Sequence, residues 1–180
     1  KAVTRSTGLG AAGRSIVSVG LDLVEQRYGP VSGRRALVIG TGAYARIVVA
    51  SLQRRGCTDI GVYSSSGRAA PFAASHHVAA VELSALPEFL GAADLVAACS
   101  GAPHHLVDLP LVRAAGLDTR AVMPFLDLAL SPDVAPEVRD LPSVDVVDLR
   151  VIGEHAPPEH AAAILEAQDI VLSAVRDFED

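Results

Sequence analysis

The chain has 180 residues, half of them hydrophobic, and a formal net charge of −6. This is enough apolar material for one sizeable core. Charges or turn residues interrupt every apolar run before the roughly twenty residues that a membrane-spanning helix needs, so we expect a soluble protein without membrane contact. Cys57 and Cys99 form neither a CxxC pair nor a metal pattern, and no cleavable leader is recognised, which predicts a reducing, cytoplasmic setting.

Charge is distributed unevenly along the chain. Six basic residues lie in the first 35 positions, whereas residues 154–180 hold seven acids against Arg176 alone. No aromatic side chains interleave with the basic ones, which favours a solvated face over a nucleic-acid surface. The chain starts at Lys1 and stops at Asp180 inside a helical pattern, so we expect a piece excised from a longer polypeptide.

The N-terminal part predicts a linker followed by a helix. Residues 1–14 are rich in Gly, Ser and Thr and are expected to be extended. Apolar positions from Ser15 to Tyr28 then recur at helical spacing, and Gly29-Pro30 would end that helix.

A repeated alternation of strand and helix follows. The expected strands cover residues 35–39, 60–63, 78–81, 95–99, 121–126 and 144–147, and the expected helices cover 43–55, 67–75, 86–90 and 109–115. The alternation predicts an α/β fold with a doubly wound parallel sheet of the Rossmann, NAD(P)-binding type, with right-handed crossovers. Ligands of such sheets bind beyond the carboxyl ends of the strands.

The segment after Pro157-Pro158 predicts a long helix. Five residues form one stripe of that helix: Ile164, Gln168, Val171, Val175 and Phe178. It could pack back on the sheet or begin a connecting or dimerising helix. The predicted organisation is therefore a linker and leader helix over 1–30, a Rossmann domain over 31–157 and the start of a connecting helix over 158–180.

A glycine-rich turn directly after the first strand is the strongest functional signal. It comprises Gly40, Thr41, Gly42, Ala43, Tyr44 and Ala45. Gly40 would allow the tight turn, Gly42 would let the backbone approach a pyrophosphate, and Ala45 is small enough to stand where a third glycine is usual. A glycine turn that merely joins two core elements is the alternative.

The end of the second strand bears on the choice of cofactor. An acidic residue there would bind the ribose hydroxyls of NAD, but this chain has Ser64, Ser65, Ser66 and, after Gly67, Arg68. Hydroxyls and a guanidinium can donate to a 2′-phosphate, which favours NADPH. The alternative is a polar surface turn with an incidental arginine.

A third loop follows the fourth strand and should reach the same sheet edge. We include Ser100, Gly101 and Ala102 in the predicted cofactor site. His104 and His105 could donate a proton or only line the cleft. His155 and His160 are separated by two prolines and out of helical register, so we predict no metal site.

Three separated segments resemble the middle domain of glutamyl-tRNA reductase. They are Arg34–Ala43 (RRALVIGTGA), Cys99–His104 (CSGAPH) and Asp127–Val138 (DLALSPDVAPEV), in the family's order and spacing. The resemblance covers nearly the whole chain. In two places the chain departs from the family pattern: Ser64–Ser66 stands for Asn-Arg-Thr, which leaves only Arg68 for the 2′-phosphate, and Ser131-Pro132 stands for Pro-Arg.

The resemblance implies an NADPH-dependent reduction of glutamyl-tRNA to glutamate-1-semialdehyde in tetrapyrrole biosynthesis. A cysteine in a separate N-terminal domain would form the thioester, and glutamyl-tRNA would bind through that domain. Neither Cys57 nor Cys99 matches the catalytic motif, so no catalytic residue is assigned and the fragment alone is expected to be inactive. The long C-terminal helix resembles the spinal helix that leads to a dimerisation domain, which implies a homodimer of the full-length protein.

Two other classes of protein remain open. One is a dehydrogenase of the shikimate type, which should carry a catalytic Lys and Asp in a preceding domain. The other is a non-catalytic module that only binds a nucleotide. Sequence upstream of Lys1 would separate the three possibilities.

Overall fold

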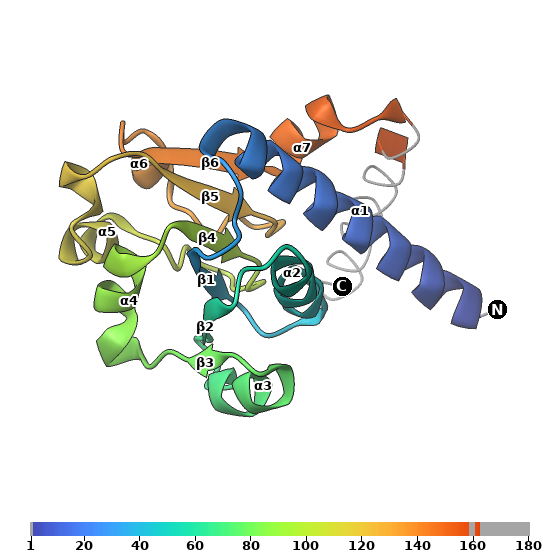
Figure 1. Cartoon of the computed structure of the whole chain (residues 1–180), viewed down its shortest axis with the longest axis horizontal. Coiled ribbons are helices and arrows are strands. Elements are labelled where there is room, and N and C mark those ends of the chain that lie inside the picture. Colours follow the sequence, from blue (N-terminus) through green and yellow to red (C-terminus); the bar gives the residue numbers. More distant parts are fainter. Residues whose placement is uncertain (1, 159–160, 163–180) are drawn as a thin grey trace.

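A six-stranded parallel sheet forms the centre of the computed structural model, which describes residues 2–158, 161 and 162. The strand order is β3-β2-β1-β4-β5-β6, so the order reverses between β1 and β4 (Figure 1). The strands are β1 (Arg35–Ile39), β2 (Asp59–Tyr63), β3 (Ala79–Ala80), β4 (Leu95–Ala98), β5 (Met123–Asp127) and β6 (Val144–Asp148). All neighbouring strands are parallel, which confirms the predicted Rossmann-type sheet.

Helices cover both faces of this sheet (Figure 1). They are α1 (Ala2–Tyr28), α2 (Ala43–Arg54), α3 (Ala69–His76), α4 (Leu86–Ala92), α5 (Leu109–Ala114), α6 (Pro136–Arg139) and α7 (Leu149–His155), with short 3-10 turns η1 (Leu83–Ala85) and η2 (Leu117–Thr119). Because successive strand side chains point to opposite faces, Ala36 and Val38 of β1 join one hydrophobic cluster and Leu37 and Ile39 join the other.

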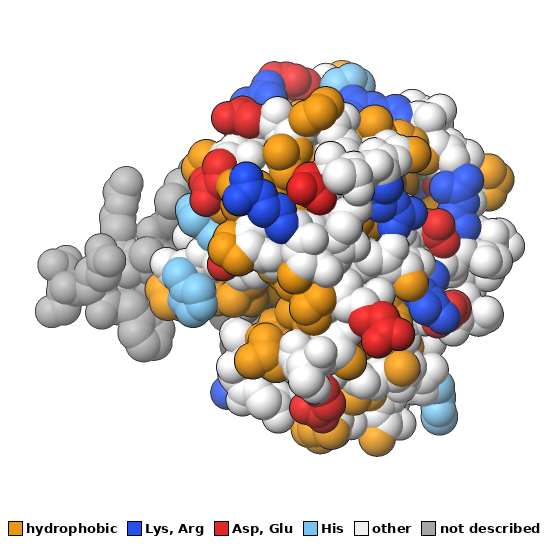
Figure 2. Space-filling model, turned by 90° about the vertical axis from the view of Figure 1, so that its left-hand side faces the viewer, with side chains coloured by type: hydrophobic (Ala, Val, Ile, Leu, Met, Phe, Trp, Pro, Cys, Tyr) orange, Lys and Arg blue, Asp and Glu red, His pale blue; other side chains and the backbone are white. Residues whose placement is uncertain are grey.

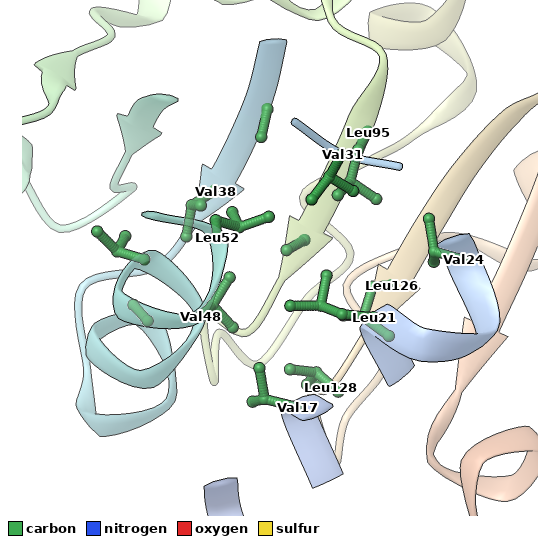
Figure 3. Packing of buried hydrophobic residues seen from close by; sticks show 14 of the residues in the cluster. Val17, Leu21, Val24, Val31, Val38, Val48, Leu52, Leu95, Leu126 and Leu128 are labelled. Carbon is green, nitrogen blue, oxygen red and sulfur yellow. The ribbon is translucent and has the colours of Figure 1, made fainter. Parts of the chain in front are cut away.

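The first cluster packs α1 and α2 against the sheet (Figure 3). From α1, Val17 and Leu21 have no exposed surface, and they lie close to Leu126 of β5 and Leu128 (Figure 3). Leu52 of α2 is equally buried. The second cluster lies under α4, α5 and α6, which contribute Leu90, Val112 and Val138 among others. Both faces of the sheet are therefore covered.

Helix α1 begins earlier than the sequence predicts. The expectation of an extended segment over residues 1–14 is wrong, because the chain is helical from Ala2 onward. Close packing explains part of the difference: a Cβ on Gly13 would lie only 2.9 Å from Cδ1 of Ile47 in α2. The absence of a side chain there lets the two helices approach, so tertiary contact outweighs the low helix propensity of glycine.

The other predicted elements are present with small shifts at their ends. The fifth strand begins at Met123 rather than Ala121, and the fourth ends at Ala98. Helices α6 and α7 were not predicted. The apolar stripe predicted between Ile164 and Phe178 lies outside the described residues. In the described part of the chain, no helix is both long and apolar enough to cross a bilayer.

Candidate cofactor site

Three loops meet at the carboxyl edge of β1, β2 and β4. The Gly40 amide donates to the Tyr63 carbonyl at the end of β2 (2.9 Å), and the Cys99 amide donates to the Ile39 carbonyl at the end of β1 (2.8 Å). These bonds bring the three predicted segments, 40–45, 64–68 and 100–102, to one edge. It is the edge at which strand order reverses, where dinucleotides bind in sheets of this type.

Gly40 joins two of these loops by close contact. Its φ is +123°, a conformation that favours glycine, and a Cβ there would lie 2.7 Å from the Cys99 carbonyl oxygen. Any side chain at this position would push the turn away from the loop that follows β4. The glycine predicted for a tight turn is therefore required by the contact with Cys99 and Ser100.

The residues after Gly40 form the start of helix α2. Gly42 is its N-cap, with no side-chain cap and no acidic residue in the first turn. A Cβ on Gly42 would meet no atom within 4 Å. The first amides of a twelve-residue helix have no acceptor within the helix, and its positive end lies beside this open position. A pyrophosphate fits this arrangement, since it would accept from these amides without collision. Ala45 is fully buried, as close packing of helix on strand requires.

The segment after β2 is a turn organised by Ser64. Its Oγ accepts from the amides of Ser66 (3.3 Å) and Arg68 (3.4 Å) and lies 2.9 Å from the Ser66 hydroxyl. Ser65, Ser66 and Arg68 are exposed. Arg68 forms no salt bridge with any described residue. Its charge is therefore available at the surface, while the Ser64 hydroxyl is largely used in folding the turn.

The turn after β4 is held by a buried acid that sequence reasoning missed. Asp133 has no exposed surface. Its Oδ2 accepts from the Ser100 amide (2.8 Å), its Oδ1 accepts from the Ser100 hydroxyl, and the same hydroxyl accepts from the Ala102 amide (3.1 Å). Burial raises the pKa of Asp133, and the two bonds from Ser100 oppose that rise.

A second buried acid, Asp127, holds the segment that carries Asp133. Its carboxylate accepts from the Val134 amide (3.1 Å) and from the Arg139 guanidinium (3.0 Å), and Arg139 also pairs with Asp148 (2.9 Å). Burial raises the pKa of Asp127. Burial also acts to raise the pKa of Asp148. Hydrogen bonds from the Val151 amide and from Arg139 outweigh this effect, so the pKa of Asp148 is lowered. A signal was present in the sequence: Asp127 ends an apolar strand, and two of the three acids lie within the segment that carries the family resemblance.

The two thiols lie at opposite edges of the sheet, since Cys57 precedes β2 and Cys99 follows β4, and two imidazoles lie on the loop after β4. Burial raises the pKa of Cys99, and it raises that of Cys57 to about 11, so both thiols stay protonated near neutral pH. His104 and His105 are exposed, and Nδ1 of His105 lies 2.7 Å from the Pro132 carbonyl oxygen. No group of three or more possible metal ligands occurs among the described residues.

The surface on the side of α4 and α5 has a mixed character. In Figure 2, acidic, basic and hydrophobic side chains are interspersed across the face toward the viewer. No continuous basic surface is visible among the described residues of that face. This face therefore does not have the electrostatic character of a nucleic-acid-binding surface.

The sheet order, the uncapped glycine turn and the flanking loops define a Rossmann-type NAD(P)-binding domain. A family profile described as shikimate / quinate 5-dehydrogenase matches residues 22–155, and the chain belongs to this family.

Within that family, the chain is similar to glutamyl-tRNA reductases. It is 44% identical to the enzyme of Renibacterium salmoninarum over 182 residues, which cover 99% of this chain and 41% of that protein. It is also 44% identical to the Kocuria rhizophila enzyme over 181 residues, which cover 99% and 39%. The chain thus spans about two fifths of the length of these relatives. The family resemblance predicted from three motifs is confirmed.

Solved structures agree with this relationship. Glutamyl-tRNA reductase from Methanopyrus kandleri superposes with a TM-score of 0.70 at 25% identity, covering 91% of this chain and 44% of that one. The nucleotide-binding domain of the Thermoplasma volcanium glutamyl-tRNA reductase superposes with a TM-score of 0.57 at 17% identity, covering 78% and 90%. The second match supports the fold alone.

Proposed function

We propose that this chain is the NADPH-binding portion of a glutamyl-tRNA reductase, whose parent protein reduces glutamyl-tRNA to glutamate-1-semialdehyde for tetrapyrrole biosynthesis. The observation that carries the proposal is the uncapped start of α2, which faces open space at Gly42 beside the ends of β2 and β4. The similarity to glutamyl-tRNA reductases over 99% of the chain supports the same function.

Each loop would bind one part of the cofactor. Amides of the turn formed by residues 40–45 would hold the pyrophosphate at the positive end of α2. Ser65, Ser66 and Arg68, exposed beyond β2, would receive the 2′-phosphate, with Ser64 fixing their turn. Residues 100–102 would border the nicotinamide, because they follow β4 on the opposite side of β1. When bound there, NADPH supplies the hydride for the reduction.

The remaining chemistry would belong to other parts of the parent protein. The raised pKa values of Cys57 and Cys99 disfavour the thiolate that a thioester-forming nucleophile requires. We therefore place the nucleophilic cysteine and the contacts with glutamyl-tRNA outside this chain, which would be inactive alone. We also infer a cytoplasmic homodimer for the full-length protein.

The substitution Gly42→Val tests the turn assignment. The Cβ position is open, so the variant should fold, but a branched side chain would occupy the place of the pyrophosphate. We expect calorimetric titration to detect no NADPH binding, with a thermal midpoint close to that of the unmodified chain. The matched control is Gly153→Val, whose Cβ also meets nothing within 4 Å and which lies in α7. Unchanged binding in Gly42→Val would overturn the proposal.

A further inference from the structure

Asp133 is a buried carboxylate directed at one turn of the proposed cofactor site. It comes from the segment between β5 and α6, thirty-three positions beyond Ser100. Its two side-chain oxygens accept from the backbone and the hydroxyl of Ser100. The side chain of Asp133 thus accepts from both hydrogen-bond donors of Ser100.

These bonds determine which part of the turn faces outward. The Ser100 hydroxyl, held by Asp133, also accepts from the Ala102 amide, so these two polar groups on either side of Gly101 are used within the protein. Gly101 itself is exposed, with a φ of +66°, and a Cβ there would meet nothing within 4 Å. The turn therefore presents bare backbone to the space beyond β4.

The backbone and the side chain of Asp133 do different work. Its carbonyl accepts from the Val107 amide (2.9 Å), and the neighbouring Ala135 amide donates to Val107 (2.9 Å), so the main chain joins the two loops. A change confined to the side chain would leave this bridge in place. What it would alter is the conformation of the turn at Ser100.

Asp133 lacks the ion pair that compensates the other buried acid, and only its bonds from Ser100 and the more distant His104 and His105 favour its charged form. Asp127, the other fully buried acid, pairs with Arg139. Asp133 forms no salt bridge with a described Lys, Arg or His. A buried carboxylate without an ion pair has a large desolvation cost. The burial of this carboxylate and its two bonds from Ser100 therefore point to a role in shaping the turn.

We infer that Asp133 is a positioning residue for the nicotinamide half of the cofactor, acting through the turn from Ser100 to Ala102. This inference rests on the proposed function. The adenosine half would bind on the other side of β1, at the ends of β1 and β2. Asp133 should therefore matter for only one half of the ligand.

The test compares two ligands on the Asp133→Asn variant of the chain. NADPH contains both halves, whereas adenosine 2′,5′-bisphosphate contains only the adenosine half. An asparagine keeps the shape but cannot accept from both Ser100 donors. We expect the Kd for NADPH to rise about tenfold, the Kd for the bisphosphate to stay unchanged, and the thermal midpoint to stay equal or rise. Asp108→Asn, which keeps the cap of α5, should change none of the three.

Other outcomes of this experiment distinguish a failure of the proposed function from a failure of the proposed role of Asp133. If the unmodified chain binds neither ligand, the proposed function falls and the role of Asp133 falls with it. If Asp133→Asn binds NADPH normally, or loses both ligands together with a lower midpoint, the positioning role is wrong and the proposed function stands. Ser100→Ala removes the hydroxyl contact with Oδ1 and leaves the amide contact with Oδ2, so it should give a smaller loss of the same selectivity; it takes the place of Asp133→Asn if that variant does not fold.

Discussion

Arg68 is the residue on which we propose that cofactor choice depends. It stands at the N-cap of α3, on a turn folded by the Ser64 hydroxyl, with its side chain exposed and without a salt bridge to any described residue. The structure also leaves no carboxylate at the end of β2, where Tyr63 leads into Ser64. A ligand with an additional phosphate at this position would gain a charge-assisted contact.

The substitution Arg68→Ala should therefore discriminate between two cofactors. We expect the Kd for NADPH to rise about tenfold and that for NADH to change less than about twofold, because only NADPH has the 2′-phosphate. Parallel calorimetric titrations measure both constants. Equal losses for the two cofactors would remove the proposed role of Arg68.

Sequence reasoning reached some of these residues and not others. The positions of Gly40 and Gly42 follow from local spacing, because a strand, a turn and a helix start are contiguous in the chain. The internal use of the Ser64 hydroxyl and the partnership of Ser100 with Asp133 could not be predicted. The first depends on the conformation of one turn, and the second joins residues thirty-three positions apart.

At the scale of elements, α1 is part of the hydrophobic core. Its residues Val17 and Leu21 are fully buried against the strands, and its C-terminal end is fixed by Tyr28, whose hydroxyl donates to Asp145 of β6 (2.6 Å). Burial and, after it, the hydrogen bond to Asp145 raise the pKa of Tyr28 to about 12. The helix is therefore tied to the sheet by apolar packing and by a polar contact.

Truncation of Leu21 tests the contribution of α1. We expect Leu21→Ala to lower the free energy of unfolding by about 3 kcal/mol, because a fully buried leucine leaves a cavity when shortened. Urea denaturation followed by circular dichroism measures this change. Leu83→Ala is the control, since Leu83 is 69% exposed. A loss below about 0.5 kcal/mol for Leu21→Ala would show that α1 is not part of the cooperative unit.

The start of α7 gives a prediction about pH. Asp148 caps this helix at the Val151 amide and pairs with Arg139, and its pKa is lowered in the folded protein. Because the pKa of Asp148 is lower in the folded than in the unfolded protein, its contribution to stability is fully present above the unfolded pKa. This contribution is lost as the pH falls through the folded pKa. We expect Asp148→Asn to be less stable than the unmodified chain by about 1 kcal/mol or less near neutral pH.

Urea denaturation of both proteins across the acid range checks this sign. The difference in free energy of unfolding should shrink as the pH falls below about 4, since protonation removes the ion pair that the variant already lacks. Asparagine can cap the helix as aspartate does, so the ion pair is what the comparison measures. A difference independent of pH would contradict the assignment.

The elements differ in how well the sequence predicts them. The strands β1 and β4 are short apolar runs bounded by turn residues, and both were placed within one residue. The first turns of α1 contain glycines that locally favour a loop, and the packing of Gly13 on Ile47 explains part of the helix there. Helix α7 begins with an aspartate cap that could have been read as a start signal.

At the scale of the whole molecule, the sheet brings three distant segments to one edge. Alternation of strands and helices predicts this edge, because parallel strands joined by right-handed crossovers end on the same side. The alternation does not predict which polar groups are held under the edge. Asp127 ends β5, but Asp133 and Arg139 are brought there by a segment of irregular structure and one short helix. The sequence therefore predicts the class of ligand, but it does not predict the buried polar residues that hold the loops of the site.

We propose that NADPH binds at this edge of the sheet. The most direct measurement is a calorimetric titration of the chain with NADPH and, separately, with NADH. We predict binding of NADPH with a lower Kd than that of NADH, because Arg68 and its serine-rich turn meet the 2′-phosphate. Binding of neither cofactor, or a lower Kd for NADH, would contradict the claim.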